Sequence, residues 1–474
     1  MAALVAVGVP AALAAAALAA VWPTAVILAA ALVVVGALVV RAPVHAFLGA
    51  LLLSAFEGAI KIRLAIEGFP SPRSVGAATI DLALVASIAG LVMRDRAATI
   101  RLLWSNLTRF ERIALGLLVA WVAISLLQSA QSGDVVAGLK GFRLSQAYVV
   151  AAVAGLLIYS SGLPEERVTR LLLYVLAAVS AYAALRTLTG PSGSEVSFVD
   201  ERSGQGAFGT TGRALGSFSS PFGVASFLVP AGAFGLVLAY LRERDRLLSA
   251  FTAVTAGVGV VGSYVRTGLV ALAAGGVFLA AMLARGRGRT RRQRLVPVGL
   301  VLLLLAAGYA GSALTSDVSE LTQERSEGLK DPLADESLST RLDTWGNVLE
   351  KVADEPLGSG LGTVGHATFT GERDSDVFTD NSYLKVIREQ GVIVGPLFVL
   401  ALLAFTGAIA VRFARAGPAR HPVGMAALAG FVSFMVLAFM AEYFEQPGKV
   451  LAWTLLGIAA WEAFVRIPSR AEVA

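Results

Sequence analysis

Apolar runs long enough to cross a lipid bilayer follow one another along almost the whole sequence. A membrane-spanning helix needs about 20 predominantly apolar residues, and about fourteen such stretches can be delimited. They are residues 2–20, 22–40, 44–66, 75–93, 111–128, 142–161, 169–188, 216–240, 247–263, 267–284, 295–314, 389–411, 423–441 and 449–466. Because lipid offers the backbone no hydrogen-bond partner, each run must satisfy its own peptide groups as a helix. The pattern predicts an all-α polytopic membrane protein with about 12–14 transmembrane helices.

Composition supports this class and excludes others. Only 15% of the residues are charged, whereas a soluble chain would carry about a quarter. The formal charge of +6 comes largely from arginines at the ends of apolar runs, which indicates topology and not nucleic-acid binding. The absence of cysteine excludes thiolate chemistry, and the three histidines (His45, His366 and His421) lie far apart. We therefore expect neither a metal nor another cofactor.

One long polar stretch divides the chain into three parts. We expect transmembrane helices over residues 1–314, an extracytoplasmic loop over 315–390, and C-terminal transmembrane helices over 391–474. Within the loop, apolar residues at helical spacing between Ser339 and Val352 predict an amphipathic helix, lying on the bilayer or packed on the loop's own core. The glycine-rich stretch Gly358–Gly365 lacks the Gly-Lys-Ser/Thr of a phosphate-binding P-loop, so we interpret it as a tight turn.

Arginine clusters in short loops set the orientation, because cytoplasmic loops are enriched in them. Five clusters agree with one topology: residues 94–112, 242–246, 285–294, 412–420 and 466–470. The second and third must lie on the same side, so an even number of spans separates them. We therefore predict a short, re-entrant-like hairpin at 247–284 with its turn at Gly262–Gly268, in preference to one long tilted helix. Residues 128–141, 189–216, 441–449 and the long loop then face outward.

Four arginines fall on the outer side, against the usual bias: Arg143, Arg213, Arg266 and Arg341. A guanidinium offers forked donors and keeps its charge at any working pH, which suits a phosphate or diphosphate. The alternative is that each lies among lipid headgroups or pairs with a carboxylate such as Glu57 or Glu442. Convergence of all four favours an anion site.

The run Thr379–Leu384 precedes an apolar span and carries the candidate base. The carboxylate of Asp380 could accept a proton from an attacking hydroxyl. Alternatively, Asp380 or Asn381 caps the helix that follows. His366, Asn381 and Tyr383 are further candidate site residues. Glu442, Glu445 and Lys449 form a short outer loop that could touch substrate, but a solvated turn is the favoured interpretation.

Three stretches resemble the O-antigen ligase and polymerase superfamily of bacterial envelope glycosyltransferases. They are Arg213–Pro221, Gly262–Gly268, and the loop region from Arg341 through Asp380 to Gly395. The resemblance implies a GT-C-like architecture in the cytoplasmic membrane, with an active site facing the periplasm or exterior. It also implies a glycan donor linked to a lipid diphosphate (undecaprenyl diphosphate), a sugar hydroxyl acceptor, surrounding membrane lipids, and no nucleic acid, nucleotide sugar or metal.

The resemblance also suggests roles for individual residues. Arg213, Arg266 and Arg341 would hold the diphosphate, and Arg143 joins them on topology alone. The ligase branch has histidine where this sequence has Asp380, which favours a polymerase, or a ligase to an acceptor other than lipid A core. A function of a different class, a transporter or flippase for lipid-linked saccharides, is also compatible with the number of spans, although no internal repeat is evident.

Overall fold

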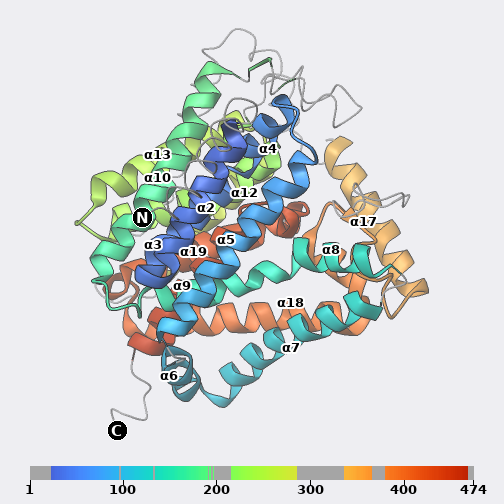
Figure 1. The fold of residues 1–474 in the computed structure, drawn as a ribbon. Coiled ribbons are helices and arrows are strands. Elements are labelled where there is room, and N and C mark those ends of the chain that lie inside the picture. The colour runs from blue at the N-terminus through green and yellow to red at the C-terminus, as the bar shows by residue number, and fades with distance from the viewer. Residues whose placement is uncertain are drawn as a thin grey trace, which may run out of the picture.

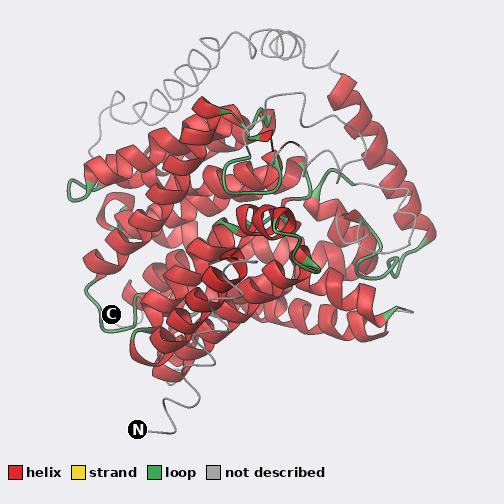
Figure 2. Ribbon diagram, turned by 45° about the horizontal axis from the view of Figure 1, so that its top comes forward, coloured by secondary structure: helices red, strands yellow, loops and turns green. Residues whose placement is uncertain are grey.

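The computed structural model is a bundle of helices, with no strand among the residues it describes (Figures 1 and 2). Described are residues 23–95, 98–131, 134–190, 192–193, 196, 215–284, 336–365 and 379–467. The spans expected at 2–20 and 295–314, and the arginine cluster at 285–294, lie outside these ranges. The described part confirms an all-α polytopic membrane fold.

Eight of the described helices are long and apolar enough to cross a membrane. They are α2 (Pro23–Arg41), α5 (Pro72–Asp95), α7 (Arg109–Gln131), α10 (Glu165–Thr189), α12 (Pro221–Leu241), α14 (Arg266–Ala284), α18 (Ser382–Ala416) and α19 (Pro422–Met440). The shorter helices are α3 (Pro43–Ala55), α4 (Glu57–Ile66), α6 (Ala98–Asn106), α8 (Val135–Ser145), α9 (Ala151–Ile158), α13 (Arg246–Gly262), α17 (Glu336–Asp354) and α20 (Lys449–Trp461). Two bent pairs, α3–α4 and α8–α9, would bring the candidate spans to 10. Helices α12 and α19 lie at the centre and are buried along most of their length.

The span expected at 44–66 is bent by 59° between α3 and α4. The segment that leads into α12 packs into this bend: the amide of Ala59 donates to the carbonyl of Ser217 at 3.0 Å. A Cβ on Gly58 would lie 2.1 Å from the backbone of Phe218, so the close approach requires glycine. The bend therefore brings the start of α4 against the residues just before α12.

The helix expected to begin at residue 142 begins earlier, because α8 already starts at Val135, within the segment 128–141 that was expected to face outward. Asp134 is the N-cap that starts this helix, since its carboxylate accepts a hydrogen bond from the amide of Ala137 at 3.0 Å. Helix α8 meets the next helical segment at a bend of 40°. Arg143 consequently lies in a helix and not at a loop end.

The region 247–284 forms two separate helices, α13 and α14, which excludes one continuous helix. The break comprises Ser263, Tyr264 and Val265, and Tyr264 has a φ of +52°. A left-handed backbone is costly for a bulky residue and is not compatible with a helix running through it. Arg266 is thereby the first residue of α14.

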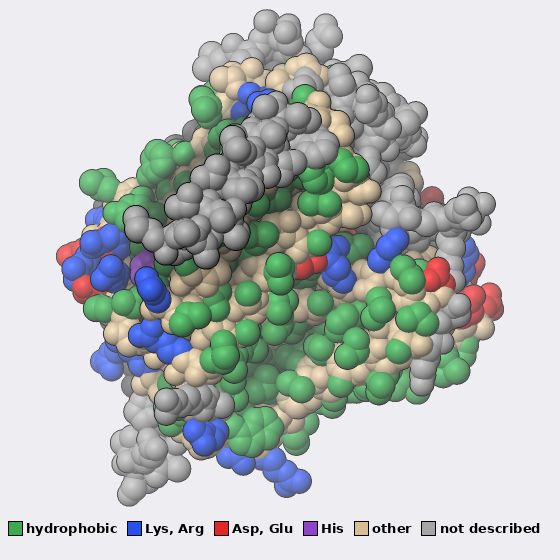
Figure 3. All heavy atoms as spheres, viewed as in Figure 1, with side chains coloured by type: hydrophobic (Ala, Val, Ile, Leu, Met, Phe, Trp, Pro, Cys, Tyr) green, Lys and Arg blue, Asp and Glu red, His purple; other side chains and the backbone are tan. Residues whose placement is uncertain are grey.

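Loops that were expected to be cytoplasmic share one end of the bundle. Arg244 and Arg466 pair with the adjacent residues Glu166 and Glu165 at the start of α10. Arg412 pairs with Glu111 at 2.7 Å and links the end of α18 to the start of α7. In Figure 3, Lys and Arg side chains gather at the left and lower edges of the molecule, and hydrophobic side chains cover much of the face between.

The amphipathic segment of the long loop is helical, as predicted, and forms α17. Val348 and Val352 are buried, and the Trp345 ring contacts Phe439 of α19 edge-on, with 5.3 Å between centroids. Leu342 and Leu349 are 52% and 54% exposed, so only part of the apolar stripe faces protein. The helix thus packs on the bundle with one edge and leaves an apolar edge that suits an interfacial position.

Candidate functional site

The start of α18 separates the two roles that the sequence left open for Asp380. The side chain of Asn381 accepts hydrogen bonds from the amides of Tyr383 and Leu384 at 2.9 and 3.1 Å, so Asn381 is the helix cap. Asp380 has a φ of +43°. This backbone conformation is uncommon outside glycine and tends to occur at functional sites. Asp380 is therefore not the N-cap of α18.

Tyr443 is the residue around which three predicted segments meet. It lies in a short 3-10 turn, Tyr443–Glu445, between α19 and α20, and its hydroxyl is 3.4 Å from that of Thr267. Burial raises the pKa of the Tyr443 phenol; the hydrogen bond to Thr267 and the charge of Arg341 lower it, and the charge of Asp380 raises it. Thr267 directly follows Arg266. The structure thus brings the start of α14 to the turn after α19, and the charges of Arg341 and Asp380 act on the same tyrosine.

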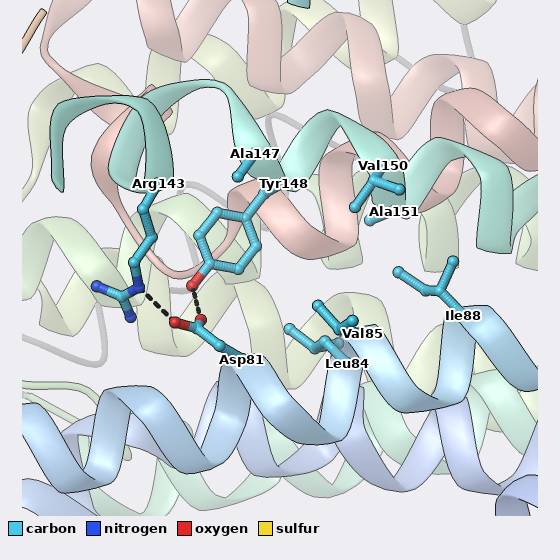
Figure 4. Close-up of a pocket in the computed structure, with 9 residues that line it drawn as sticks. All are labelled: Asp81, Leu84, Val85, Ile88, Arg143, Ala147, Tyr148, Val150 and Ala151. Atoms are coloured by element: carbon cyan, nitrogen blue, oxygen red, sulfur yellow. Dashed lines mark hydrogen bonds and ion pairs between the residues drawn. The ribbon is translucent and has the colours of Figure 1, made fainter. Parts of the chain in front are cut away.

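Arg143 lies in a different environment. It forms an ion pair with Asp81 of α5, and the hydroxyl of Tyr148 donates to the same carboxylate (Figure 4). These three side chains stand at one end of a pocket of about 190 Å³, whose remaining lining is apolar (Figure 4). Pairing with a carboxylate is the alternative that the sequence left open for each outer arginine.

Other predicted residues have definite places or lie outside the described ranges. The Tyr383 hydroxyl donates to the carbonyl of Met435 at 3.0 Å and so ties α18 to α19. Arg213 and His366 lie outside the described residues. Leu215–Ser220, which follow Arg213 in sequence, do reach the site: Ser220 hydrogen-bonds to Gln446 at 3.4 Å, close to Tyr443 in the chain.

The glycine-rich stretch is a turn that binds protein through its backbone. The amide of Gly362 donates to the carboxylate of Glu389, and that of Gly360 to the Glu389 carbonyl, both at 3.0 Å. Opposite the turn, α18 is kinked at Gly391, whose φ is +83°. A Cβ there would lie 2.3 Å from the carbonyl oxygen of Pro356, so the contact depends on glycine. The turn fixes the first part of α18, which begins two residues after Asp380.

A buried group of charges lies below Asp380. The ammonium of Lys385 is 2.5 Å from Glu389 and 3.2 Å from Glu445, and all three side chains are at most 1% exposed. Charges are buried only where paired and hydrogen-bonded, because desolvation costs several kcal/mol for each ion. The three charges are therefore specifically paired inside the bundle.

The prediction that Glu442, Glu445 and Lys449 form a solvated turn is wrong, because these residues are only 3–6% exposed. Glu442 accepts hydrogen bonds from Thr379, and Glu445 faces Lys385. Lys449 donates to the carbonyl of Glu445 at 3.2 Å and lies over the Tyr148 ring. The contacts of these three residues are thus with Thr379, Lys385 and Tyr148 and with one another.

Reasoning from the sequence missed Tyr443, Lys385 and Glu389. Lys385 and Glu389 carry a detectable signal, since charges beside or within an apolar span are costly and indicate a buried partner. Tyr443 carries a weaker one, as an aromatic residue in an acidic outer turn. Among the described residues, no group of three or more His, Asp or Glu side chains is placed to hold a metal ion.

The fold and these segments define a multi-pass membrane protein with a polar, partly buried centre at one end of its bundle. Residues 251–399 match the family described as O-antigen ligase, a range that includes Arg266, Arg341 and Asp380. No curated protein matches the chain. The match confirms the resemblance to the O-antigen ligase and polymerase superfamily. It supports an enzymatic role of the O-antigen ligase or polymerase type in envelope polysaccharide assembly, a family that implies lipid-linked glycans and polysaccharides as substrates.

Proposed function

We propose that the protein is a glycosyltransferase that moves a glycan from a lipid diphosphate, undecaprenyl diphosphate, to a sugar hydroxyl. The reaction takes place at the outer face of the cytoplasmic membrane and polymerises or ligates an envelope polysaccharide. One observation carries the proposal. The Tyr443 hydroxyl is 3.4 Å from that of Thr267, the residue after Arg266, and the turn containing Tyr443 binds Thr379 and Ser382, on either side of Asp380. The start of α14 and the Asp380 turn therefore meet at the segment after α19, and the charge of Arg341 acts on the same tyrosine.

The chemistry follows from the character of these groups. Asp380 accepts the proton of the acceptor hydroxyl, whose oxygen attacks the anomeric carbon as the bond to the diphosphate oxygen breaks. The diphosphate leaves with the electron pair, and attack from the opposite side inverts the anomeric centre. Arg266 and Arg341 stabilise the charge that develops on the leaving group, and Arg213 is expected to join them. Guanidinium groups take the place of a metal ion in this scheme.

The arrangement of charges along the bundle supports an outward-facing site. The arginine loops gather at one end, where Arg244, Arg412 and Arg466 form ion pairs. Short loops rich in arginine favour the cytoplasmic side. The turn at Tyr443 follows α19 at the end opposite to its start at Pro422, next to the arginine loop, so it lies on the outer side in this orientation.

The test is glycan joining by the full-length protein in membranes, with a lipid diphosphate-linked glycan as donor. We expect Arg266→Ala and Asp380→Asn each to lower the rate by at least about 100-fold, as removal of one transition-state donor or base does. Arg415→Ala, an exposed arginine at the opposite end of α18, is the matched control and should retain activity. Full activity in both site variants would refute the proposal. Movement of donor across liposomes without joining would instead identify a transporter.

A further inference from the structure

The backbone at Asp380 is held in an unfavourable conformation from both sides. Its φ of +43° costs energy in any residue with a side chain, and such strain persists only where the surroundings over-determine it. On the C-terminal side, Asn381 caps α18, and the hydroxyl of Ser382 donates to the carbonyl of Ala441 at 2.8 Å. The amide of Phe444 donates to the same hydroxyl at 3.2 Å. Two contacts thus join this side to the turn that follows α19.

On the N-terminal side, one carboxylate makes the connection. An oxygen of Glu442 accepts hydrogen bonds from both the amide and the hydroxyl of Thr379, at 2.9 and 2.7 Å. Thr379 is fully buried and Glu442 is 5% exposed, so water does not compete for these bonds. Hydrogen bonds to a charged acceptor are about twice as strong as neutral ones. Glu442 therefore fixes the residue directly before Asp380.

The carboxylate of Glu442 has its own support from the glycine turn. A Cβ on Gly365 would lie 2.4 Å from Glu442 Oε2 and 2.7 Å from Lys385 Cε. Glu442 Oε2 thus packs closely against Gly365, next to Lys385, while its other carboxylate oxygen binds Thr379.

We propose that Glu442 is a positioning residue for the reaction, acting through Thr379 to hold Asp380 in its left-handed backbone conformation. The inference rests on the proposed role of Asp380 as the base. A displacement of about 1 Å at a reacting group can cost on the order of 100-fold in rate. Loss of the carboxylate should therefore lower kcat and leave the donor KM nearly unchanged, because the arginines that hold the donor are intact.

The experiment compares Glu442→Ala with Glu442→Gln in the full-length protein, measured per folded molecule. We expect Glu442→Ala to lower kcat by about 10- to 100-fold. The amide oxygen of Glu442→Gln still accepts from Thr379 and should restore most of the rate. Thr379→Val, which loses the hydroxyl, should resemble a mild form of Glu442→Ala, and Thr379→Ser should be close to wild type. Equal loss in Glu442→Ala and Glu442→Gln would overturn the positioning role, because the charge itself would then be required.

A matched buried carboxylate separates positioning from general structural damage. Glu462 is fully buried and binds the amide of Gly424, at the opposite end of α19. Glu462→Ala should reduce the yield and Tm of the folded protein without a comparable fall in kcat. An equal fall in kcat for Glu462→Ala and Glu442→Ala would overturn the inference.

A double-mutant cycle connects Glu442 to Asp380. If Glu442 acts through Asp380, Glu442→Ala should have little further effect in an Asp380→Asn background. Additive losses would contradict the inference while leaving the proposed function intact. An Asp380→Asn variant with full activity would contradict the proposed function itself, so the two failures can be told apart.

Discussion

The hydroxyl of Thr267 lies 3.4 Å from the hydroxyl of Tyr443, although 176 residues separate them in the chain. Thr267 follows Arg266 at the start of α14, and Tyr443 follows Glu442 at the end of α19. This contact therefore joins the arginine of the α13–α14 break to the turn that holds Asp380. A shift of either segment is transmitted directly to the other.

Removal of the Tyr443 hydroxyl tests this connection. Tyr443→Phe keeps the ring, which contacts Phe222 edge-on, and loses only the polar contact with Thr267. We expect about 1 kcal/mol less stability, the ordinary value for one intramolecular hydrogen bond. The rate of glycan joining should fall by about fivefold if the same free energy is lost from the alignment of the site, because about 1.4 kcal/mol corresponds to a factor of ten. Steady-state kinetics in nanodiscs and a thermal unfolding curve measure both quantities.

Tyr159→Phe is the control for this variant. Tyr159 forms the same kind of contact with Thr169, at 3.0 Å, near the arginine-rich end of the bundle. It should lose similar stability and keep its activity. Equal activity losses in the two variants would show that the hydroxyl of Tyr443 matters only for folding.

The order of helices could be predicted from the sequence because run length alone decides whether a segment spans a bilayer. The predicted spans at 169–188 and 423–441 correspond closely to α10 and α19. The bend at Gly58 could not be predicted, since it depends on the approach of Phe218, far away in the chain. Tertiary contacts of this kind leave no periodic signal in the bent segment itself.

In the candidate site, too, some features could be predicted from the sequence and others depend on tertiary contacts. Arg266 and Arg341 were identified because they oppose a topological bias, which is a property of the sequence. The burial of Glu442 could not be predicted in this way, because its partner Thr379 lies 63 residues away in the chain and only the fold brings the two together. The sequence offered two adjacent residues as the cap of α18, and the backbone conformation assigns that role to Asn381.

Gly365→Ala tests whether the glycine turn must remain close to Glu442. Gly365 has a φ of +78°, and an added Cβ would lie 2.4 Å from the Glu442 carboxylate. Gly360→Ala is the matched control: its φ is +95°, but the nearest atom to an added Cβ is 3.8 Å away. We expect about 1–2 kcal/mol of destabilisation in both from the left-handed backbone. Only Gly365→Ala should also lose activity, because a displaced Glu442 would no longer hold Thr379, the residue before Asp380, in place.

The ion pair between Glu355 and Arg388 predicts a pH-dependent contribution to stability. The hydrogen bond and charge of Arg388 hold the pKa of Glu355 below its usual range, against a smaller opposing effect of burial. The pair therefore stabilises the fold fully above the unfolded pKa, about 4.3, and the contribution is lost as pH falls through the lower folded pKa. Because the Glu355 side chain is 51% exposed, we expect less than about 1 kcal/mol.

Thermal unfolding of wild type and Glu355→Gln between pH 7 and about 3 checks this contribution. The difference in Tm should be present at pH 7 and should shrink at the acid end. Glu350→Gln, an exposed change on α17, should match wild type throughout. A difference that grows as the pH falls would contradict the sign of the pKa shift.

Arg341 is expected to act through the geometry of its guanidinium and not through charge alone. A lysine at this position keeps the charge but loses the forked donors that match phosphate oxygens. Arg341→Lys should therefore recover only part of the activity lost in Arg341→Ala, with the larger defect in kcat if the contact strengthens as the diphosphate departs. Asp343→Ala, exposed on the same helix, controls for damage to α17 and should retain activity. Wild-type kinetics in Arg341→Ala would remove Arg341 from the proposed site, and full recovery in Arg341→Lys would reduce its role to that of a point charge.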